Sequence, residues 1–595
     1  MRRLSKVLVA MLCGVIGFSF AGCGSNAPKS SVEINFMYDI SLNRTNVYKD
    51  LIKEYNDGQG KDDKVYVVGM PRSGIADKAY SNLSKKSVTS NVYTLGSGEF
   101  NRLAMEGYLL ELDSYVSGET PLDLSDIPET IVNRYRFNAT KNSDGKFVAG
   151  EGAPLVAVPN GIRPNVLYYH TKYFNTLGIN VISVSEAELK TSTQYSSVMP
   201  HGYAEYISEP YAGAVSSVNL AGETVYKVFN TLIPMNWEEF RYLAKCFTKA
   251  YNPTSPSNYG YMGEYWYHYG WSVGGDCTQW DGEKYVFTLA DNKANYLAVQ
   301  DVTVNDKLYH AGEIVSYEDK IKDTGIGSKT ELYELPSQET ALKEFLALGL
   351  DASKDGYHVM NMDDRGIAAT LLSSGAIAMY CESTTYANVA GGKRDRYCDV
   401  APLPQYREYV DGSTYQKGGS GFANEYLKVI GKEYDNVTYT GKLKTHDNTE
   451  NGTPIVGRMA SFERGECFVI PKNSDASKYE AAWKFIRWAA GKEGQTILAT
   501  NDIAVPNQIS LMQSNEWLNA TDKTFANCAT LALIVSDTKV GDMDYFENNE
   551  WVSAWSTSFN ASLRFGGMSL NDFMNSVKTK ADAALASKTI YNKAL

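Results

Sequence analysis

The sequence predicts an α/β protein with more than one domain, and three observations support this prediction. Strand-like and helix-like hydrophobic patterns alternate along the first part of the chain. Of its 595 residues, 43% are hydrophobic and 21% are charged, so the chain can bury a sizeable core. Its length also exceeds that of a typical single domain.

The first predicted elements alternate between strand and helix. In chain order they are a strand at 32–39, a helix through 47–55, a strand at 65–69, a helix through 76–83, a strand at 91–95 and a helix through 100–104. Such an order implies right-handed crossovers and a parallel sheet. Ligands of open parallel sheets bind beyond the carboxyl ends of the strands. Asp39 and Glu99, at two such ends, are therefore candidate ligand-binding acceptors.

Two helices are predicted farther along the chain. Asn236 and Glu239 form a capping-box pattern before an apolar stripe, so Trp237 is interpreted as a core residue rather than a ligand contact. The segment 477–495 has a second helical stripe, in which Trp483 is also assigned to packing. Polar stretches between these elements are interpreted as insertions, at 181–230, 301–335 and 406–460.

The N-terminus has the pattern of an export signal. Positive charges in the first six residues precede an apolar stretch, 7–20, which is too short to span a bilayer. Ala21 and Gly22 directly before Cys23 resemble the lipobox of bacterial lipoproteins, so we expect a signal peptide at 1–22, lipidation of Cys23, and a tether at 23–31. The prediction is a lipid-anchored protein on the extracytoplasmic face of the cell membrane. An ordinary secretory leader is the alternative.

Charge and motifs exclude several functions. The formal net charge of −12 argues against binding to nucleic acid, which requires a basic surface. Six cysteines follow Cys23, without CxxC spacing, and no HExxH, GxSxG or phosphate-loop motif occurs. We therefore expect no cofactor, no metal site and no catalytic centre. The spacing of the acidic residues does not identify a glycosidase pair.

Six motifs follow one another in the mature chain: MEGYLLELDSYV, AVPNGIRPNVLYYHTKYFNTLGI, PMNWEEF, GAIAMYCE, CDVAPLP and ECFVIPKNSDASKYEAAWKFI. Together they resemble the family of extracellular solute-binding proteins of ABC importers, in particular its maltose-type oligosaccharide binders. The second motif ends in Tyr169-His170, where the family usually has Tyr-Asn.

The resemblance implies a two-lobed periplasmic-binding-protein-like fold with a hinge, in which each lobe is discontinuous in sequence. Lobe one would comprise 32–160 and 384–487, and lobe two 164–381 and 488–595. Such a protein captures a sugar or oligosaccharide by lobe closure and delivers it to the transmembrane subunits of an ABC permease. The lipid on Cys23 would keep it beside that permease.

The most aromatic stretch, 259–276, lies where the family places ligand contacts of lobe two. Glu264, Tyr265 and Trp266 stand at the position of a Glu-x-Tyr-aromatic contact segment of maltose-type binders, with Trp271 as a neighbour. Aromatic rings cover the apolar face of a sugar, and carboxylates bind its hydroxyls. The alternative is a tyrosine-rich core strand.

The resemblance also suggests contacts from other parts of the chain. Arg163 stands where relatives have a ligand-contacting side chain, although a salt bridge at the hinge is an equal alternative. Glu382 and Tyr386 follow the GAIAMYC strand, and Glu463 precedes the CFVIP strand. Leu95 and Gly98 replace a Trp and an Asp of maltose-type binders, which argues against maltose itself.

Two other classes of function remain open. A surface carbohydrate-active enzyme would also need aromatic residues and carboxylates. A binder of peptides or of another small solute would share the two-lobed fold.

Overall fold

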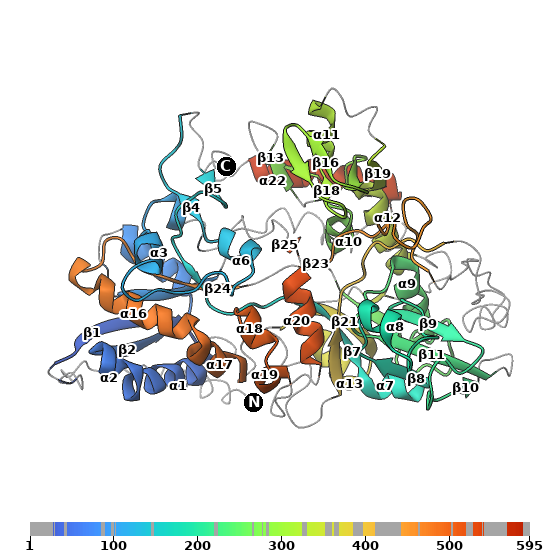
Figure 1. The fold of residues 1–595 in the computed structure, drawn as a ribbon, viewed down its shortest axis with the longest axis horizontal. Helices are drawn as coiled ribbons and strands as arrows, with labels where there is room; N and C mark the ends of the chain where they lie inside the picture. The colour runs from blue at the N-terminus through green and yellow to red at the C-terminus, as the bar shows by residue number, and fades with distance from the viewer. Residues whose placement is uncertain are drawn as a thin grey trace, which may run out of the picture.

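The structure is a computed structural model of the chain. It describes residues 28–586 except 29, 41–43, 85–87, 89, 97–99, 101–102, 144–147, 219–223, 264–266, 276–277, 281–284, 289, 324–329, 351–359, 362–367, 385–396, 411–441, 462–464, 501–503, 519–526, 538 and 541–567. Figure 1 shows two bodies side by side, each built around its own five-stranded sheet. None of the described helices is both long and apolar enough to cross a membrane.

The first sheet contains the predicted parallel strands. Its order is β2 (Val65–Arg72), β1 (Val32–Asp39), β3 (Val92–Gly96), β24 (Glu466–Val469) and β6 (Val158–Pro159). Strand β1 runs parallel to β2 and β3, whereas β24 is antiparallel to β3 and β6. The predicted alternation of strand and helix is therefore confirmed, and a distant segment completes the sheet.

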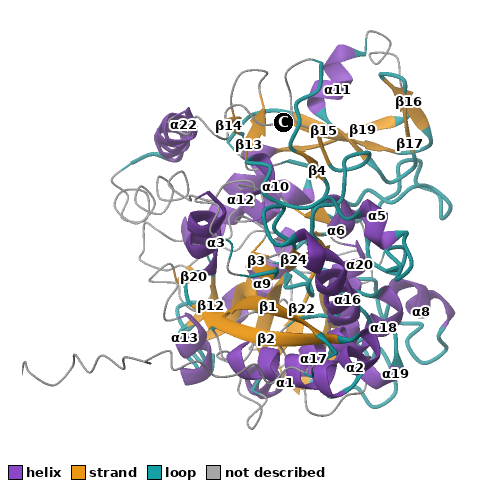
Figure 2. Ribbon diagram, turned by 90° about the vertical axis from the view of Figure 1, so that its left-hand side faces the viewer, coloured by secondary structure: helices purple, strands orange, loops and turns teal. Residues whose placement is uncertain are grey.

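Helices cover both faces of this sheet. Those that pack around it are α1 (Arg44–Asp57), α2 (Gln59–Asp63), α3 (Ile75–Ser84), α16 (Tyr479–Ala490) and α17 (Lys492–Thr500). Figure 2 shows β1 and β2 between α1 and α2 on one side and α3 on the other. Trp483 is fully buried, as predicted. The ring of Phe485 lies 5.0 Å from that of Phe36, which joins α16 to β1.

The second sheet has the order β20 (Met360–Asn361), β12 (Tyr259–Met262), β21 (Ile377–Ser383), β7 (Asn165–His170) and β22 (Cys398–Ala401). Strand β7 is antiparallel to both of its neighbours. Around this sheet lie α7 (Thr171–Thr176), α9 (Trp237–Cys246), α10 (Tyr267–Ser272), α12 (Gln338–Leu350) and α13 (Ala368–Ser374).

The predicted start of α9 is confirmed. Asn236 accepts a hydrogen bond from the backbone N–H of Glu239, and the Glu239 carboxylate accepts one from the N–H of Asn236. Two donors of the first helical turn are thereby satisfied. Trp237 is 8% exposed and stacks on Tyr269 at 5.2 Å, so it is a core residue, as predicted.

The predicted insertions contain further elements. The first carries β8 (Ile179–Ile182), α8 (Glu186–Thr191), β9 (Tyr203–Tyr206), β10 (Ser217–Val218) and β11 (Thr224–Asn230). The second carries β16 (Val302–Val304), β17 (Lys307–Tyr309), β18 (Ile314–Val315), α11 (Tyr317–Lys322) and most of β19 (Leu332–Ser337), and β15 (Ala294–Ala298) directly precedes it. Residues 405–410, here called the bridging segment, are extended and connect these insertions.

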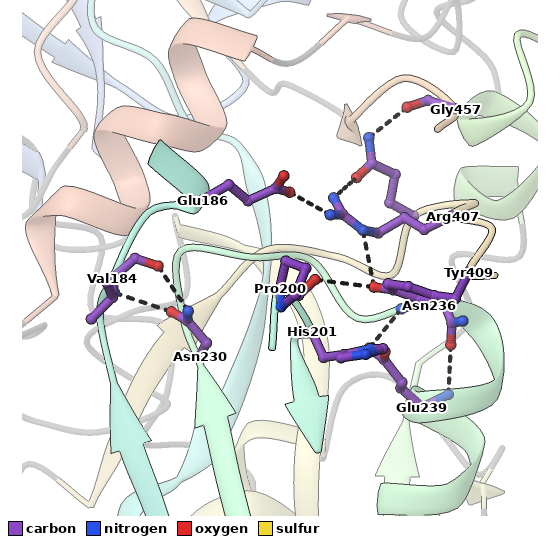
Figure 3. Close-up of polar contacts among 11 residues, drawn as sticks. Val184, Glu186, Pro200, His201, Asn230, Asn236, Glu239, Arg407, Tyr409 and Gly457 are labelled. Carbon is purple, nitrogen blue, oxygen red and sulfur yellow. Dashed lines mark hydrogen bonds and ion pairs between the residues drawn. The ribbon is translucent and has the colours of Figure 1, made fainter. Parts of the chain in front are cut away.

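One face of the bridging segment contacts the first insertion (Figure 3). The guanidinium of Arg407 pairs with Glu186. The hydroxyl of Tyr409 donates to the backbone oxygen of Pro200 at 3.3 Å, and its ring lies 4.1 Å from that of His201. Because side chains alternate along an extended chain, the intervening residues point the other way.

The opposite face contacts the second insertion and its own. Tyr333 and Lys444 donate to the Glu408 carboxylate at 2.9 and 2.7 Å. Thr453 adds a hydrogen bond from its hydroxyl to the backbone oxygen of Val299, at 2.6 Å. The described parts of the three insertions therefore contact one another through hydrogen bonds and ion pairs, and they are not independent loops.

The structure differs from the predicted lobe boundaries at three places, the first of which is the bridging segment, since 384–487 was assigned to lobe one but this segment contacts the insertions of the second body. Strand β22 belongs to the second sheet, although 384–487 was assigned to lobe one, because its register with β7 places Cys398 opposite His170. Helix α17 packs on α1 and α16, although 488–595 was assigned to lobe two. Later elements are α18 (Ile509–Met512), α19 (Asn515–Leu518), α20 (Cys528–Asp537) and α22 (Leu570–Ala586), of which α20 reaches β22 and α22 reaches β14 (Tyr285–Phe287).

Candidate functional site

Three strand ends of the first sheet lie at the same edge. Strands β1 and β3 are parallel and end at Asp39 and Gly96. Glu466, the first residue of the antiparallel β24, pairs with Gly96. The chain therefore leaves β1 and β3, and enters β24, at this one edge. Glu99 and Glu463 belong to the adjoining segments but lie outside the described residues.

The second sheet repeats this arrangement. Its parallel strands β12 and β21 end at Met262 and Ser383, and β7 begins at Asn165, which pairs with Ser383. The aromatic stretch leaves β12 at this edge. Four predicted contacts follow these strand ends and lie outside the described residues, namely Glu264, Tyr265, Trp266 and Tyr386.

A five-residue segment, 160–164, joins the two sheet edges, and we call it the hinge segment. It runs from the end of β6 to the start of β7. The N–H of Asn160 donates to the backbone oxygen of Glu466 at 2.7 Å, and the oxygen of Pro164 accepts from the N–H of Thr384 at 3.0 Å. The carboxyl ends of both sets of parallel strands therefore meet beside the hinge segment, where α/β proteins bind their ligands.

Gly161 gives the hinge segment its path. Its φ of +74° lies in the left-handed region, which glycine adopts without strain. A Cβ at this position would collide with the Cβ of Ala504. Next to it, Ile162 exchanges two backbone hydrogen bonds with Val505, at 2.9 and 2.8 Å. A third part of the chain therefore packs tightly on the hinge segment.

A buried polar network surrounds the Glu466 carboxylate. Its Oε2 accepts from the Tyr48 hydroxyl at 2.7 Å, and Tyr48 accepts from the Asn160 amide at 2.8 Å. The guanidinium of Arg163 lies 3.4 Å from the same Oε2. Tyr48, Asn160 and Arg163 are each 0% exposed. The network links α1 and β24 of the first sheet to the hinge segment.

Arg163 therefore forms the salt bridge that was the alternative to a ligand contact. With its side chain wholly buried, a solute would reach it only if this pair opened. The carboxylate of Glu382 also has partners within the protein. It accepts hydrogen bonds from the Tyr380 hydroxyl at 3.1 Å and from the N–H of Ser383 at 2.8 Å, and Glu382 is 5% exposed. Asp39 is half-buried at the end of β1 and faces Arg72 of β2 in register.

Trp271 is a core residue. It lies in α10, is 0% exposed and packs in the hydrophobic core of the second body. Its backbone oxygen accepts from the Arg458 guanidinium at 2.7 Å. The expectation that it neighbours a ligand is therefore not supported, because the short helix turns the ring inward.

Sequence reasoning did not single out Tyr48, Asn160, Asn165, Thr384 or Glu466. A signal was nevertheless present for some of them. Asn160 and Asn165 stand, with Arg163 between them, in a stretch that is apolar on both sides, and Glu466 begins β24, whose other residues are apolar. Polar residues in buried strands require partners or a function, so these positions could have been noticed.

Titratable groups around the second sheet are held neutral by burial. Burial raises the pKa of the Cys398 thiol to about 12 and raises that of Cys381. Burial also lowers the pKa of His170 to about 4. No disulfide joins the cysteines at 246, 381, 398, 467 and 528. Among the described residues, no cluster of His, Cys, Asp and Glu could hold a metal ion.

Two α/β bodies whose strand ends meet at a hinge define a two-lobed binding protein. The family model described as bacterial extracellular solute-binding protein matches residues 50–526. The chain therefore belongs to this family, which is extracytoplasmic. No curated protein sequence matches the chain.

Solved structures share the fold. A cyclic alpha-maltosyl-1,6-maltose binding protein from Arthrobacter globiformis has a TM-score of 0.53 at 12% identity, over 94% of this chain and 100% of that one. An ABC substrate-binding protein from Listeria monocytogenes in complex with cycloalternan has a TM-score of 0.52 at 12% identity, over 93% and 99%. UgpB from Mycobacterium tuberculosis, in complex with glycerophosphocholine, has a TM-score of 0.53 at 13% identity, over 94% and 99%.

Proposed function

We propose that the protein is the receptor of an ABC importer, which captures a sugar or oligosaccharide between its lobes and passes it to a membrane permease. The observation that carries this proposal is the meeting of both sets of strand ends at the hinge segment, with the aromatic stretch leaving β12 at the same edge. Two of the proteins of similar fold are named for, or bound to, a cyclic oligosaccharide.

Capture requires no chemistry on the solute. A solute that contacts both lobes favours the closed arrangement by the difference between its affinities for the closed and open states. The permease would then recognise the closed receptor. We propose that Asp39, Glu99, Glu264, Tyr386 and Glu463 contribute contacts, because all follow or precede strand ends at the two edges.

Replacing Cys23 with serine should release the protein from the membrane. The proposed anchor is a lipid on the Cys23 thiol, and serine cannot form the thioether. Fractionation of cells, with labelling by a radioactive fatty acid, measures the outcome: the wild-type protein is labelled and sediments with membranes, and the variant is neither. The control is Cys13→Ser, which changes a leader cysteine outside the lipobox. Membrane retention of Cys23→Ser would contradict the anchor.

A glycan panel should identify a stabilising solute. A ligand that binds only the folded state, at about 100 times its Kd, adds about 2.7 kcal/mol to stability. We expect the melting temperature of the mature protein to rise by a few degrees with at least one linear or cyclic glucose oligosaccharide.

Replacing Trp266, which lies outside the described residues, with alanine should weaken that binding by about 1–3 kcal/mol if its ring covers a sugar face.

Two results would contradict the proposal. If no glycan raises the melting temperature and glycerophosphocholine does, the protein binds a non-sugar solute, as UgpB does. If chromatography shows glycan cleavage that Glu264→Gln abolishes, the protein is a surface carbohydrate-active enzyme.

A further inference from the structure

Two polar side chains at the start of the second body stand out by their burial. Asn165 is the first residue of β7 and is 1% exposed. Thr384 directly follows β21 and is 6% exposed. Asn165 pairs with Ser383, and the N–H of Thr384 donates to the oxygen of Pro164. The two backbones are therefore adjacent, at the junction of the hinge segment with the second sheet.

Neither side chain hydrogen-bonds to any part of the chain that the structure describes. This holds for both amide atoms of Asn165 and for the hydroxyl of Thr384, all of which are inaccessible to solvent. A buried polar group without a partner costs about 1–3 kcal/mol. Folded proteins keep few such groups, and those they keep require a specific explanation.

Two neighbouring hydroxyls at this edge are hydrogen-bonded, whereas the Oδ1 of Asn160 in the hinge segment is, like the pair, buried without a partner among the described residues. The hydroxyl of Ser461 donates to the backbone oxygen of Asn165 at 2.8 Å, and that of Ser383 donates to the oxygen of Arg163 at 3.3 Å. The backbone oxygen of Asn165 is therefore hydrogen-bonded, whereas the side-chain amide has no hydrogen-bond partner among the described residues.

The position of the pair links it to solute capture. Both residues adjoin the hinge segment, which joins the two sheets. An amide offers a donor and an acceptor, and a hydroxyl offers both, which matches the hydroxyl groups of a sugar. We propose that Asn165 and Thr384 are solute-binding residues whose polar groups are satisfied by hydroxyls of the bound solute. This inference rests on the proposed function.

The inference gives Asn165→Leu an unusual signature. Leucine keeps the approximate shape of asparagine but removes the amide, so the protein without solute should lose no stability. Asn230 is the matched control, since it is also 1% exposed but both the nitrogen and the oxygen of its amide are hydrogen-bonded. It exchanges hydrogen bonds with Val184 at 3.1 and 2.7 Å (Figure 3) and accepts from the N–H of Leu232 at 3.1 Å. Asn230→Leu should therefore lower the melting temperature by several degrees.

Thr384→Val has a matched control of the same kind. The hydroxyl of Thr248, which is 1% exposed, donates to the backbone oxygen of Ala244 at 2.7 Å. Thr248→Val should therefore destabilise the protein without solute, whereas Thr384→Val should not.

The experiment measures melting temperatures without solute and Kd values by calorimetry for maltotetraose, cycloalternan and any other panel glycan that stabilises the wild type. We expect Asn165→Leu to keep the melting temperature and to raise the Kd about tenfold or more, since a solute hydroxyl would then lose its partner.

Two results would overturn the inference. One is a loss of melting temperature in Asn165→Leu equal to that in Asn230→Leu, which would indicate a structural role. The other is an unchanged or lower Kd. If no glycan binds the wild type, the sugar proposal fails instead. The melting temperatures then decide the inference. A lower melting temperature in Asn230→Leu, with no change in Asn165→Leu, would support the conclusion that the Asn165 amide has no partner within the chain.

Discussion

Replacing Arg163 with methionine is expected to lower the free energy of unfolding by about 3–5 kcal/mol, because the Glu466 carboxylate would remain buried without its cation. Arg163 is wholly buried and the Glu466 side chain is 8% exposed. Methionine retains the apolar bulk of the arginine chain, so the change reports chiefly on charge. Urea denaturation followed by circular dichroism measures it.

Two further variants test this explanation. Adding Glu466→Gln to Arg163→Met should restore part of the stability, since the unpaired charge is then removed. Lys442→Met removes the cation of an exposed pair, Lys442 and Glu450, whose side chains are 75% and 90% exposed, and should leave stability unchanged. An Arg163→Met protein as stable as the wild type would show that the buried pair contributes nothing.

His201→Ala is expected to cost a similar amount, about 3–5 kcal/mol, from the loss of a buried partner and of packing. The His201 Nδ1 lies 2.5 Å from the Glu239 carboxylate, and both side chains are 0% exposed. Glu239 also caps α9, and the His201 ring packs on Tyr409. The deletion therefore removes the partner of a buried carboxylate and a contact of the bridging segment.

The matched control for this deletion is His310→Ala. His310 lies 3.2 Å from Asp301, and the two side chains are 64% and 61% exposed. Water can replace that histidine, so denaturation of the His310 variant should match the wild type. Equal losses in the two variants would mean that burial of the His201 pair is not what stabilises it.

Local patterns were sufficient to predict much of the fold. The stripe of Val47, Leu51 and Tyr55 predicted α1, and the Asn236-Glu239 spacing predicted the start of α9. Both signals arise within a few residues, where helix periodicity and capping operate. Alternating strands and helices also predicted the parallel pairing of β1 with its neighbours.

Contacts between distant residues were not predictable in this way. Glu466 meets Tyr48 from 418 positions away and Arg163 from 303, so no local pattern marks these partners. The same limit explains β22, whose sheet is decided by pairing with β7. Trp271 was misplaced because an aromatic-rich stretch suits a binding surface and a core equally well. Only the short helix α10 distinguishes them.

The bridging segment constrains how this receptor could change its size. Arg407 pairs with Glu186 of the first insertion on one face, and on the other face Glu408 accepts from Tyr333 of the second insertion and from Lys444 of its own. Removing the first insertion would leave the Arg407 guanidinium without its carboxylate, and removing the second would leave the Glu408 carboxylate without the Tyr333 hydroxyl. The insertions of the second body therefore depend on one another for side-chain partners. A receptor shortened in one of them would need new residues at the contacts that lose their partners.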